Sequence, residues 1–231
     1  MLTESDFVTD HWVGCGGLHM VQPCEAIISA ALPSAETVRL LDAGCGCGAI
    51  GLSLLSSGAA SELVMMDIDP ASVNFAVVNT QRLLTGARRE SVRTYLSDGW
   101  QAGTELLPEQ PFDVIVCNAP MSAQPPADAT VNPFRFWTDN WDFQRKLFSH
   151  LSTYLRPQGI VIIKDLFGSM WWRDLPVRCV LTAVGDAPSL QSSSQLFTVQ
   201  GGEVRGQQVF PTKSVAVGNM HHCLRVFQLE A

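Results

Sequence analysis

The sequence predicts a single α/β domain built on a doubly wound, mostly parallel β-sheet. Apolar runs of strand length recur along the 231 residues, and segments with helical spacing of apolar residues lie between them. Several of these runs are rich in Val, Ile and Leu without polar alternation, which is typical of strands covered by helices on both faces. The order of the segments requires right-handed crossovers within one sheet. A chain of this length can bury a substantial core.

Six segments have the composition of strands, and three have that of helices. The strand segments are 37–44, 61–69, 91–98, 111–118, 159–167 and 221–230, and the helical segments are 49–59, 70–86 and 139–159. The first two helices are expected to end at Gly58 and Gly86, because glycine suits the C-terminal cap. The third is expected to end at Pro157 and Gly159. Two other segments, 120–140 with four prolines and the Ser-, Gln- and Gly-rich 191–218, are interpreted as a long loop and as a loop with a hairpin.

Composition excludes several classes of function. The formal net charge is −7 and the basic residues are scattered, so the sequence shows no footprint for a phosphate backbone. Nucleic acid is therefore expected to be an unlikely partner. No stretch of about 18 uncharged apolar residues suggests a membrane span. The acidic start, MLTESDFVTDHW, lacks the pattern of a secretion signal, so we expect a cytoplasmic protein.

The seven cysteines are expected to be reduced thiols, because their count is odd and they include no CxxC pair. The alternative is a zinc site formed by Cys45, Cys47 and the segment His221 to Cys223. A CxC pair inside a glycine loop lacks the usual spacing of metal ligands, so we expect no metal.

A glycine-rich loop follows the first predicted strand. In LLDAGCGCGAIGLSLL, Asp42 ends the strand and glycines stand at every second position before a helix. Glycines allow the tight turn and let the backbone approach a ligand. The next strand ends in VMMDID, which places Asp67 where an acid can bind a ribose diol. Loop and acid together predict a cofactor that contains adenosine.

The glycine spacing leaves two cofactor classes open. Gly46, Gly48 and Gly51 match the dinucleotide fingerprint GxGxxG, which would seat the pyrophosphate of a nicotinamide cofactor. Asp42 argues against this class, because a carboxylate directed into the loop would repel a pyrophosphate. The same carboxylate could anchor a cationic amino group, and S-adenosylmethionine carries one.

The sequence resembles the class I S-adenosylmethionine-dependent methyltransferases from Arg39 to Lys164. The segments LDAGCGCGAIGLSLL, MMDIDPASVNFAVVN, YLSDGW, FDVIVCNAP and LRPQGIVII follow in the family's order. The resemblance implies a Rossmann-like methyltransferase fold with a seven-stranded sheet whose last strand is antiparallel. It also implies S-adenosylmethionine as cofactor and S-adenosylhomocysteine as product. The implied cofactor contacts are Asp42, Gly44, Gly46 and Gly48 at the methionine moiety, Asp67 at the ribose, Ile68 and Asp98 at the adenine, and Gly99 and Asn118 beside them.

We expect one methyltransferase domain over residues 1–231. Within it, residues 1–38 form an N-terminal cap segment, 39–168 the cofactor-binding core, and 169–231 the C-terminal strands and substrate-side elements. In the cap segment, LHMVQPCEAIISAAL resembles the part of glutamine-modifying methyltransferases in which a proline and a glutamate introduce a helix over the cofactor. Pro23 and Glu25 fill those places.

The motif NAPM, from Asn118 to Met121, resembles the NPPY motif of amino-group methyltransferases. These enzymes act on glutamine amides of release factors, exocyclic amines of nucleobases and some small molecules. An amide or aryl amine is a poor nucleophile, so its nitrogen must be aligned and its lone pair localised. The oxygen of Asn118 and the carbonyl of Ala119 could each accept one N–H, while Pro120 fixes the turn. A cap at the strand end is the alternative role for Asn118.

Two departures from that motif affect the predicted acceptor. Ala119 replaces a proline, and Met121 replaces an aromatic residue that would stack on a planar acceptor. Aromatic residues of the long loop could instead supply the surface on which the acceptor stacks; the candidates are Phe134, Phe136, Trp137 and Trp141. We assign Pro23, Met121, Phe136 and Trp137 to the substrate side. A small-molecule or peptide acceptor is expected; a nucleobase methyltransferase and a cofactor-binding protein without catalysis are the alternatives.

Overall fold

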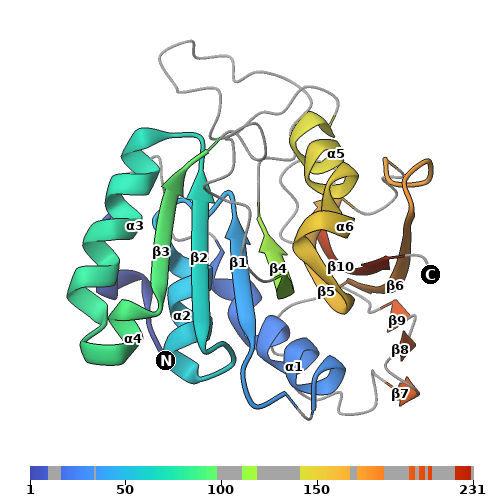
Figure 1. The fold of residues 1–231 in the computed structure, drawn as a ribbon, viewed down its shortest axis with the longest axis horizontal. Helices are drawn as coiled ribbons and strands as arrows, with labels where there is room; N and C mark the ends of the chain where they lie inside the picture. The colour runs from blue at the N-terminus through green and yellow to red at the C-terminus, as the bar shows by residue number, and fades with distance from the viewer. Residues whose placement is uncertain are drawn as a thin grey trace.

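The computed structural model describes residues 1–9, 17–33, 35–97, 111–118, 141–166, 171–184, 198–200, 203–205, 208–209 and 222–229. Its centre is a sheet of eight strands in the order β3-β2-β1-β4-β5-β10-β6-β9, with helices on both faces (Figure 1). The strands are β1 (Arg39–Ala43), β2 (Glu62–Asp67), β3 (Val92–Leu96), β4 (Phe112–Cys117), β5 (Leu155–Leu166), β6 (Val177–Val184), β9 (Gln208–Val209) and β10 (His222–Leu229). A separate hairpin pairs β7 (Thr198–Gln200) with β8 (Glu203–Arg205).

The predicted sheet is confirmed. Strands β3, β2, β1, β4 and β5 are parallel, and the last strand, β10, runs antiparallel to both β5 and β6. All six predicted strands are present. The two-residue strand β9 adds an eighth member beside β6, and β6 itself was not predicted.

The described helical segments are η1 (Glu4–Asp6), η2 (Leu18–Met20), α1 (Val21–Ala31), α2 (Ala49–Ser57), α3 (Pro70–Leu83), α4 (Gly86–Glu90), α5 (Asp142–Ser149) and α6 (Leu151–Tyr154). Gly58 caps α2 with φ 87°, as predicted. None of the helices in the described ranges is long and apolar enough to cross a membrane.

Two predicted helix ends are wrong. Helix α3 ends at Leu83, and Gly86 is the first residue of the short helix α4 rather than the cap of α3. Strand β5 begins at Leu155, so Pro157 and Gly159 lie inside a strand. They lie where the pairing of β4 with β5 shifts register, and such an irregularity tolerates proline.

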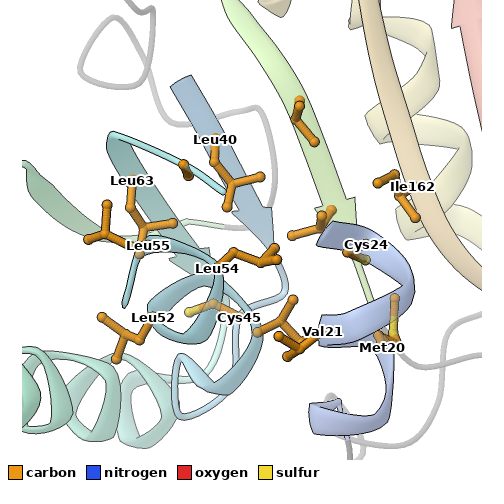
Figure 2. Close-up of a cluster of buried hydrophobic side chains, with 14 of the residues drawn as sticks. Met20, Val21, Cys24, Leu40, Cys45, Leu52, Leu54, Leu55, Leu63 and Ile162 are labelled. Carbon is orange, nitrogen blue, oxygen red and sulfur yellow. The ribbon is translucent and has the colours of Figure 1, made fainter. Parts of the chain in front are cut away.

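Buried side chains form two clusters, one on each face of the sheet, because neighbouring residues of a strand point to opposite faces. The first contains Leu40 and packs against α1, α2 and α3, and the second contains Leu41 and packs against α5 and α6. Figure 2 shows the first cluster, in which Met20, Val21 and Cys24 of the N-terminal segment lie near the helix that follows the glycine loop.

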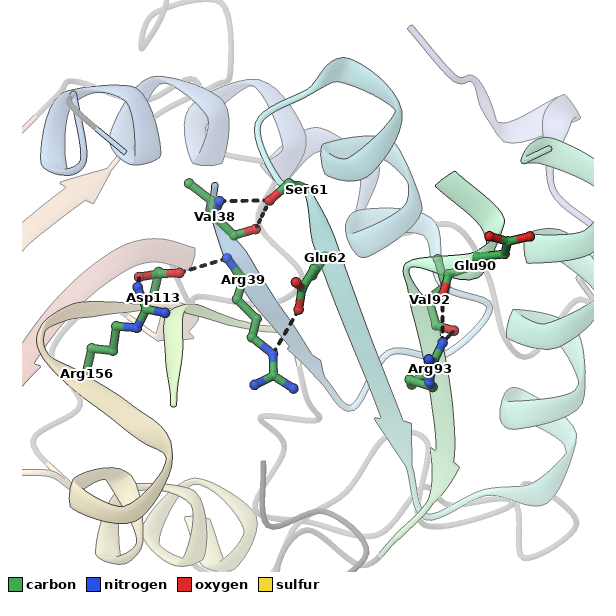
Figure 3. Close-up of polar contacts among 9 residues, drawn as sticks. All are labelled: Val38, Arg39, Ser61, Glu62, Glu90, Val92, Arg93, Asp113 and Arg156. Carbon is green, nitrogen blue, oxygen red and sulfur yellow. Dashed lines mark hydrogen bonds and ion pairs between the residues drawn. The ribbon is translucent and has the colours of Figure 1, made fainter. Parts of the chain in front are cut away.

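A polar network aligns the strands at their amino ends (Figure 3). The buried Asp113 accepts hydrogen bonds from the backbone N–H of Arg39 at 2.8 Å and from the Arg156 guanidinium at 2.6 Å. The Arg39 side chain forms an ion pair with Glu62 at 3.3 Å. These contacts join β1, β2, β4 and β5, so the carboxyl ends of these strands reach a common edge.

Candidate functional site

The carboxyl ends of three parallel strands bring the predicted site segments to one edge of the sheet. Ala43, the last residue of β1, pairs with Met66 of β2 and with Cys117 of β4. The next residue of each segment is a predicted site residue: Gly44, Asp67 and Asn118, respectively. Ligands of open α/β sheets bind at this edge.

The glycines of the loop are required by its backbone conformation. Gly44, Gly46 and Gly48 have φ values of 73°, 56° and 81°, in the left-handed region that side chains rarely enter. A Cβ on Gly48 would also approach Leu52 Cδ1 and Met65 Sδ to 3.0 Å. The alternating pattern is therefore the sequence signature of this turn.

Several N–H groups of the loop bond within the protein rather than facing a ligand. Gly44 and Cys45 both donate to the carbonyl of Met66 at 2.9 Å, and Gly48 donates to the carbonyl of Cys45 at 2.9 Å. Cys45 and Cys47 are buried thiols, as small space-filling residues would be. These bonds hold the loop against β2, so a bound ligand would contact its other groups.

Asp67 holds the same loop from the end of β2. Its Oδ2 accepts the N–H of Gly46 at 2.8 Å, and its Oδ1 accepts the N–H of Asp69 at 2.9 Å. Burial raises the pKa of the Asp67 carboxyl, while these two bonds act in the opposite direction. A carboxylate has about four acceptor positions, so Asp67 keeps capacity for two further donors, such as the hydroxyls of a ribose.

Asp42 lies buried at the end of β1 and supports the helix that follows the loop. Its Oδ2 accepts the N–H of Gly51 in the first turn of α2 at 2.8 Å. Its Oδ1 is buried and has no hydrogen-bond partner among the residues that the structure describes. Burial raises the pKa of the Asp42 carboxyl to about 7, with a smaller contribution from the charge of Asp67.

The glycine at position 51 has a packing role. A Cβ there would lie 2.9 Å from Asp42 Oδ2 and 2.8 Å from Leu63 Cδ1. Gly51 therefore makes room for the carboxylate that caps α2. This packing explains its match to the dinucleotide fingerprint without a pyrophosphate.

The N-terminal segment reaches Asn118 at the end of β4. A Cβ on Gly17 would lie 2.6 Å from Ile50 Cδ1 and 3.3 Å from Asn118 Nδ2, so this backbone passes close to both side chains. Pro23 lies buried in the first turn of α1. The expected helix therefore follows directly on a segment that borders the proposed catalytic residue.

Two residues that sequence reasoning missed organise this edge. Asn79 of α3 is fully buried, accepts the N–H of Val8 at 2.7 Å, and donates to the carbonyls of Val8 and Cys47 at 2.9 Å. Asp69 caps α3 by accepting from Ser72 N at 3.1 Å and Ser72 Oγ at 2.8 Å. The Asp-Pro pair before a helix signals the cap, whereas no local pattern signals Asn79.

The other predicted residues divide into described and undescribed ones. Ile68 is 39% exposed beside Asp67, a position open to a planar ligand. Trp141 stacks on Trp171 with ring centroids 6.1 Å apart. The remaining predictions lie outside the described residues: Asp98, Gly99, Ala119, Pro120, Met121, Phe134, Phe136 and Trp137.

Comparison with protein families decides the class of this site. Residues 19–162 match the family described as the methyltransferase small domain. The chain belongs to this family. Membership confirms the predicted methyltransferase class and the cofactor, S-adenosylmethionine.

Two curated relatives match parts of the chain. The release factor glutamine methyltransferase of Cereibacter sphaeroides is 29% identical over 149 residues, which cover 61% of this chain and 50% of that protein. The ribosomal RNA large subunit methyltransferase G of Psychromonas ingrahamii is 27% identical over 95 residues, 40% of this chain and 23% of that protein. The chain thus spans half or less of the length of these curated relatives.

A solved structure shares the fold. The putative tRNA (m1A22) methyltransferase Sp1610 of Streptococcus pneumoniae superposes with a TM-score of 0.51 at 12% identity, covering 88% of this chain and 69% of that one.

The prediction that nucleic acid is an unlikely partner is wrong. One of the curated relatives is named for ribosomal RNA. Net charge and the spacing of basic residues describe the sequence, whereas a contact surface for RNA is assembled by the fold. The net charge of −7 therefore does not exclude this class of acceptor.

Proposed function

We propose that this chain transfers the methyl group of S-adenosylmethionine to a planar amide or amine nitrogen. The observation that carries the proposal is the position of Asn118, directly after β4 and beside the strand that leads into the glycine loop. Its side chain is partly exposed at the carboxyl edge. On this basis we propose that NAPM has the role in this chain that the NPPY motif has in amino-group methyltransferases.

The described residues fit the proposed cofactor. Asp42 Oδ1 is a buried oxygen without a partner in the described ranges, and a cationic amino group would supply the missing donor. Asp67 keeps acceptor positions for ribose hydroxyls, and Ile68 offers an apolar surface for a base. When bound, S-adenosylmethionine supplies an electrophilic methyl group at this edge.

Asn118 would then orient the acceptor nitrogen. Its Oδ1 can accept one N–H of the acceptor, which turns the nitrogen lone pair away from that bond and toward the methyl group. No strong base is needed beforehand, because the N–H becomes acidic only as the new bond to carbon forms. The carbonyl of Ala119 would accept the second N–H.

A glutamine carboxamide of a protein is the acceptor that we place first. The relative named for release factor glutamine methylation matches 61% of this chain, more than the ribosomal RNA relative does. An exocyclic amine of an RNA base is the second candidate, supported by the 27% identity to the latter. Both acceptors present the planar N–H group that Asn118 can bind.

Methyl transfer tests the proposal directly. The chain is incubated with S-adenosylmethionine labelled in the methyl group and, separately, with a bacterial release factor and with large-subunit ribosomal RNA. We expect label on one of them, and a loss of about 100-fold or more in rate for Asn118→Ala that is much larger than its loss of affinity for S-adenosylhomocysteine. Binding of the cofactor without transfer to either acceptor would favour a protein that has lost catalysis and would overturn the proposal.

A further inference from the structure

Lys164 lies one strand beyond Asn118 at the same edge of the sheet. Strand β5 runs parallel to β4, and Ile163 pairs with Cys117, so the next step along both strands places Lys164 beside Asn118. Neighbouring strands lie about 4.8 Å apart. On its other side, Lys164 pairs with Leu224 of β10.

Alternation along the strands puts Lys164 and Asn118 on one face. Ile160 and Ile162 belong to the cluster that packs against α1 and α2, and Lys164 continues that row. Val114 and Val116 belong to the same cluster, and Asn118 continues theirs. In Figure 2, Ile162 lies on the same side of the sheet as Met20 and Cys24, which belong to the same buried cluster.

The Lys164 ammonium has no counter-charge in the described part of the chain, where it forms no ion pair or side-chain hydrogen bond. The adjacent Asp165 points to the opposite face, where it binds Arg225 at 2.8 Å and Trp171 at 3.3 Å. Lys164 is half-buried, and this burial lowers the pKa of its amino group. A partly desolvated charge without a partner is costly and favours a ligand of opposite charge.

The order of the strands assigns this charge to the acceptor rather than to the cofactor. Asp67 on β2 and the glycine loop after β1 lie on one side of Asn118, and Lys164 on β5 lies on the other. The distance from β1 to β5 is two strand spacings, about 10 Å. A methyl acceptor held at Asn118 therefore extends toward Lys164.

We propose that Lys164 is an anion-binding residue of the acceptor subsite, where it holds a carboxylate or phosphate oxygen that the methyl acceptor carries near its reactive nitrogen. This inference rests on the proposed function, because it takes Asn118 as the place of the acceptor nitrogen. The shared chemistry is an oxyanion; a protein acceptor would supply a carboxylate and an RNA acceptor a phosphate.

The small number of lysines makes a direct test possible. The chain has three, at positions 146, 164 and 213, and reductive ¹³C-methylation labels each while keeping its charge. The Lys164 signal is assigned from Lys164→Met. Lys146 is the control, because it lies partly exposed on α5 and pairs with Asp142 at 2.9 Å.

With S-adenosylhomocysteine saturating, inorganic phosphate and acetate are titrated in separate samples. We expect a saturable shift of the Lys164 signal with at least one anion and none for Lys146. Tighter binding of phosphate would point to a nucleic-acid acceptor, and tighter binding of acetate to a protein carboxylate. A Lys164 signal that responds to neither anion, or that shifts on addition of S-adenosylhomocysteine alone, would overturn the inference.

Steady-state kinetics with the acceptor found in the transfer assay gives a second measurement. Lys164→Met should raise KM for the acceptor about tenfold or more, with a much smaller effect on kcat and an unchanged affinity for S-adenosylhomocysteine. Lys164→Arg should recover most of the loss, because it keeps the charge. An equal loss for Lys146→Met would contradict a local role. Failure of the wild-type chain to bind S-adenosylhomocysteine would instead refute the proposed function.

Discussion

Asp42 supports helix α2 with one of its two carboxyl oxygens. Helix α2 begins after Gly48, which has no side chain with which to cap it, and Asp42 reaches from β1 to accept the N–H of Gly51 at 2.8 Å. The other oxygen is buried and accepts no hydrogen bond from the described part of the chain. The sequence shows an acid at a strand end, but only the fold shows that this acid is buried behind the loop. The predicted contact with the methionine moiety would use this second oxygen, which the helix does not bind.

The pKa of Asp42 predicts how stability changes with pH. Its folded-state value, about 7, lies above the ordinary value of 3.8, so between these values the folded chain keeps a proton that the unfolded chain has released. This contribution to the free energy of unfolding is full below about pH 4 and is lost as pH rises through about 7. Relative to wild type, Asp42→Asn should therefore gain up to about 4 kcal/mol between pH 4 and pH 8, measured by urea unfolding. A constant difference across this range would contradict a buried, titrating carboxyl.

At the scale of the loop, substitutions at Gly48 and Gly58 can distinguish the cost of backbone strain from the cost of lost packing space. Both have positive φ, 81° and 87°, but a Cβ on Gly58 meets nothing within 4 Å while one on Gly48 meets Leu52 and Met65 at 3.0 Å. Gly58→Ala should cost about 1 kcal/mol from conformation alone. Gly48→Ala should cost clearly more and weaken S-adenosylhomocysteine binding, measured by thermal unfolding and calorimetry. Equal losses would show that Gly48 is needed only for its φ.

The hydrogen bonds of Asn79 join three elements that are far apart in the sequence. Asn79→Ala should leave the Val8 N–H and the Cys47 carbonyl without this partner, at a cost of about 1–3 kcal/mol. Hydrogen exchange should then accelerate at Val8 and in the glycine loop. Thr80→Ala is the matched control, because the Thr80 hydroxyl donates to the carbonyl of Ala76 within its own helix. Unchanged exchange at Val8 in Asn79→Ala would show that other contacts hold the N-terminal segment.

For the whole molecule, the strands were predictable and the links between them were not. Uninterrupted apolar runs identify buried parallel strands, which is why the six predicted strands are correct. Strand β6, VRCVLTAV, contains polar residues and lies next to the edge strand β9. Its apolar pattern is therefore weaker than that of the central strands. The helix ends predicted at Gly86 and Pro157 were wrong, because glycine and proline each suit several local structures. The neighbouring elements decide which of these structures forms. Asp113 lies inside an apolar run. Its hydrogen bonds to Arg39 and Arg156 form only when strands that are distant in the sequence pair with one another.

The same limit applies to the site. Asp67 and the loop glycines stand in a local pattern that reflects the turn itself, so sequence alone could identify them. Lys164 and Asn118 become neighbours only through the register of β4 and β5. The prediction that nucleic acid is an unlikely partner failed for a related reason, since overall charge says little about a surface that the fold assembles.

Calorimetric titration with S-adenosylhomocysteine tests the central claim most directly, because every proposal depends on a cofactor bound at the carboxyl edge of β1, β2 and β4. We predict micromolar binding to the wild-type chain, loss of binding in Asp67→Ala, and unchanged binding in Glu62→Gln, which alters the other end of the same strand. Circular dichroism should show that all three proteins are folded. A folded wild-type chain that does not bind S-adenosylhomocysteine, or an Asp67→Ala variant that binds it as tightly as wild type does, would contradict the account.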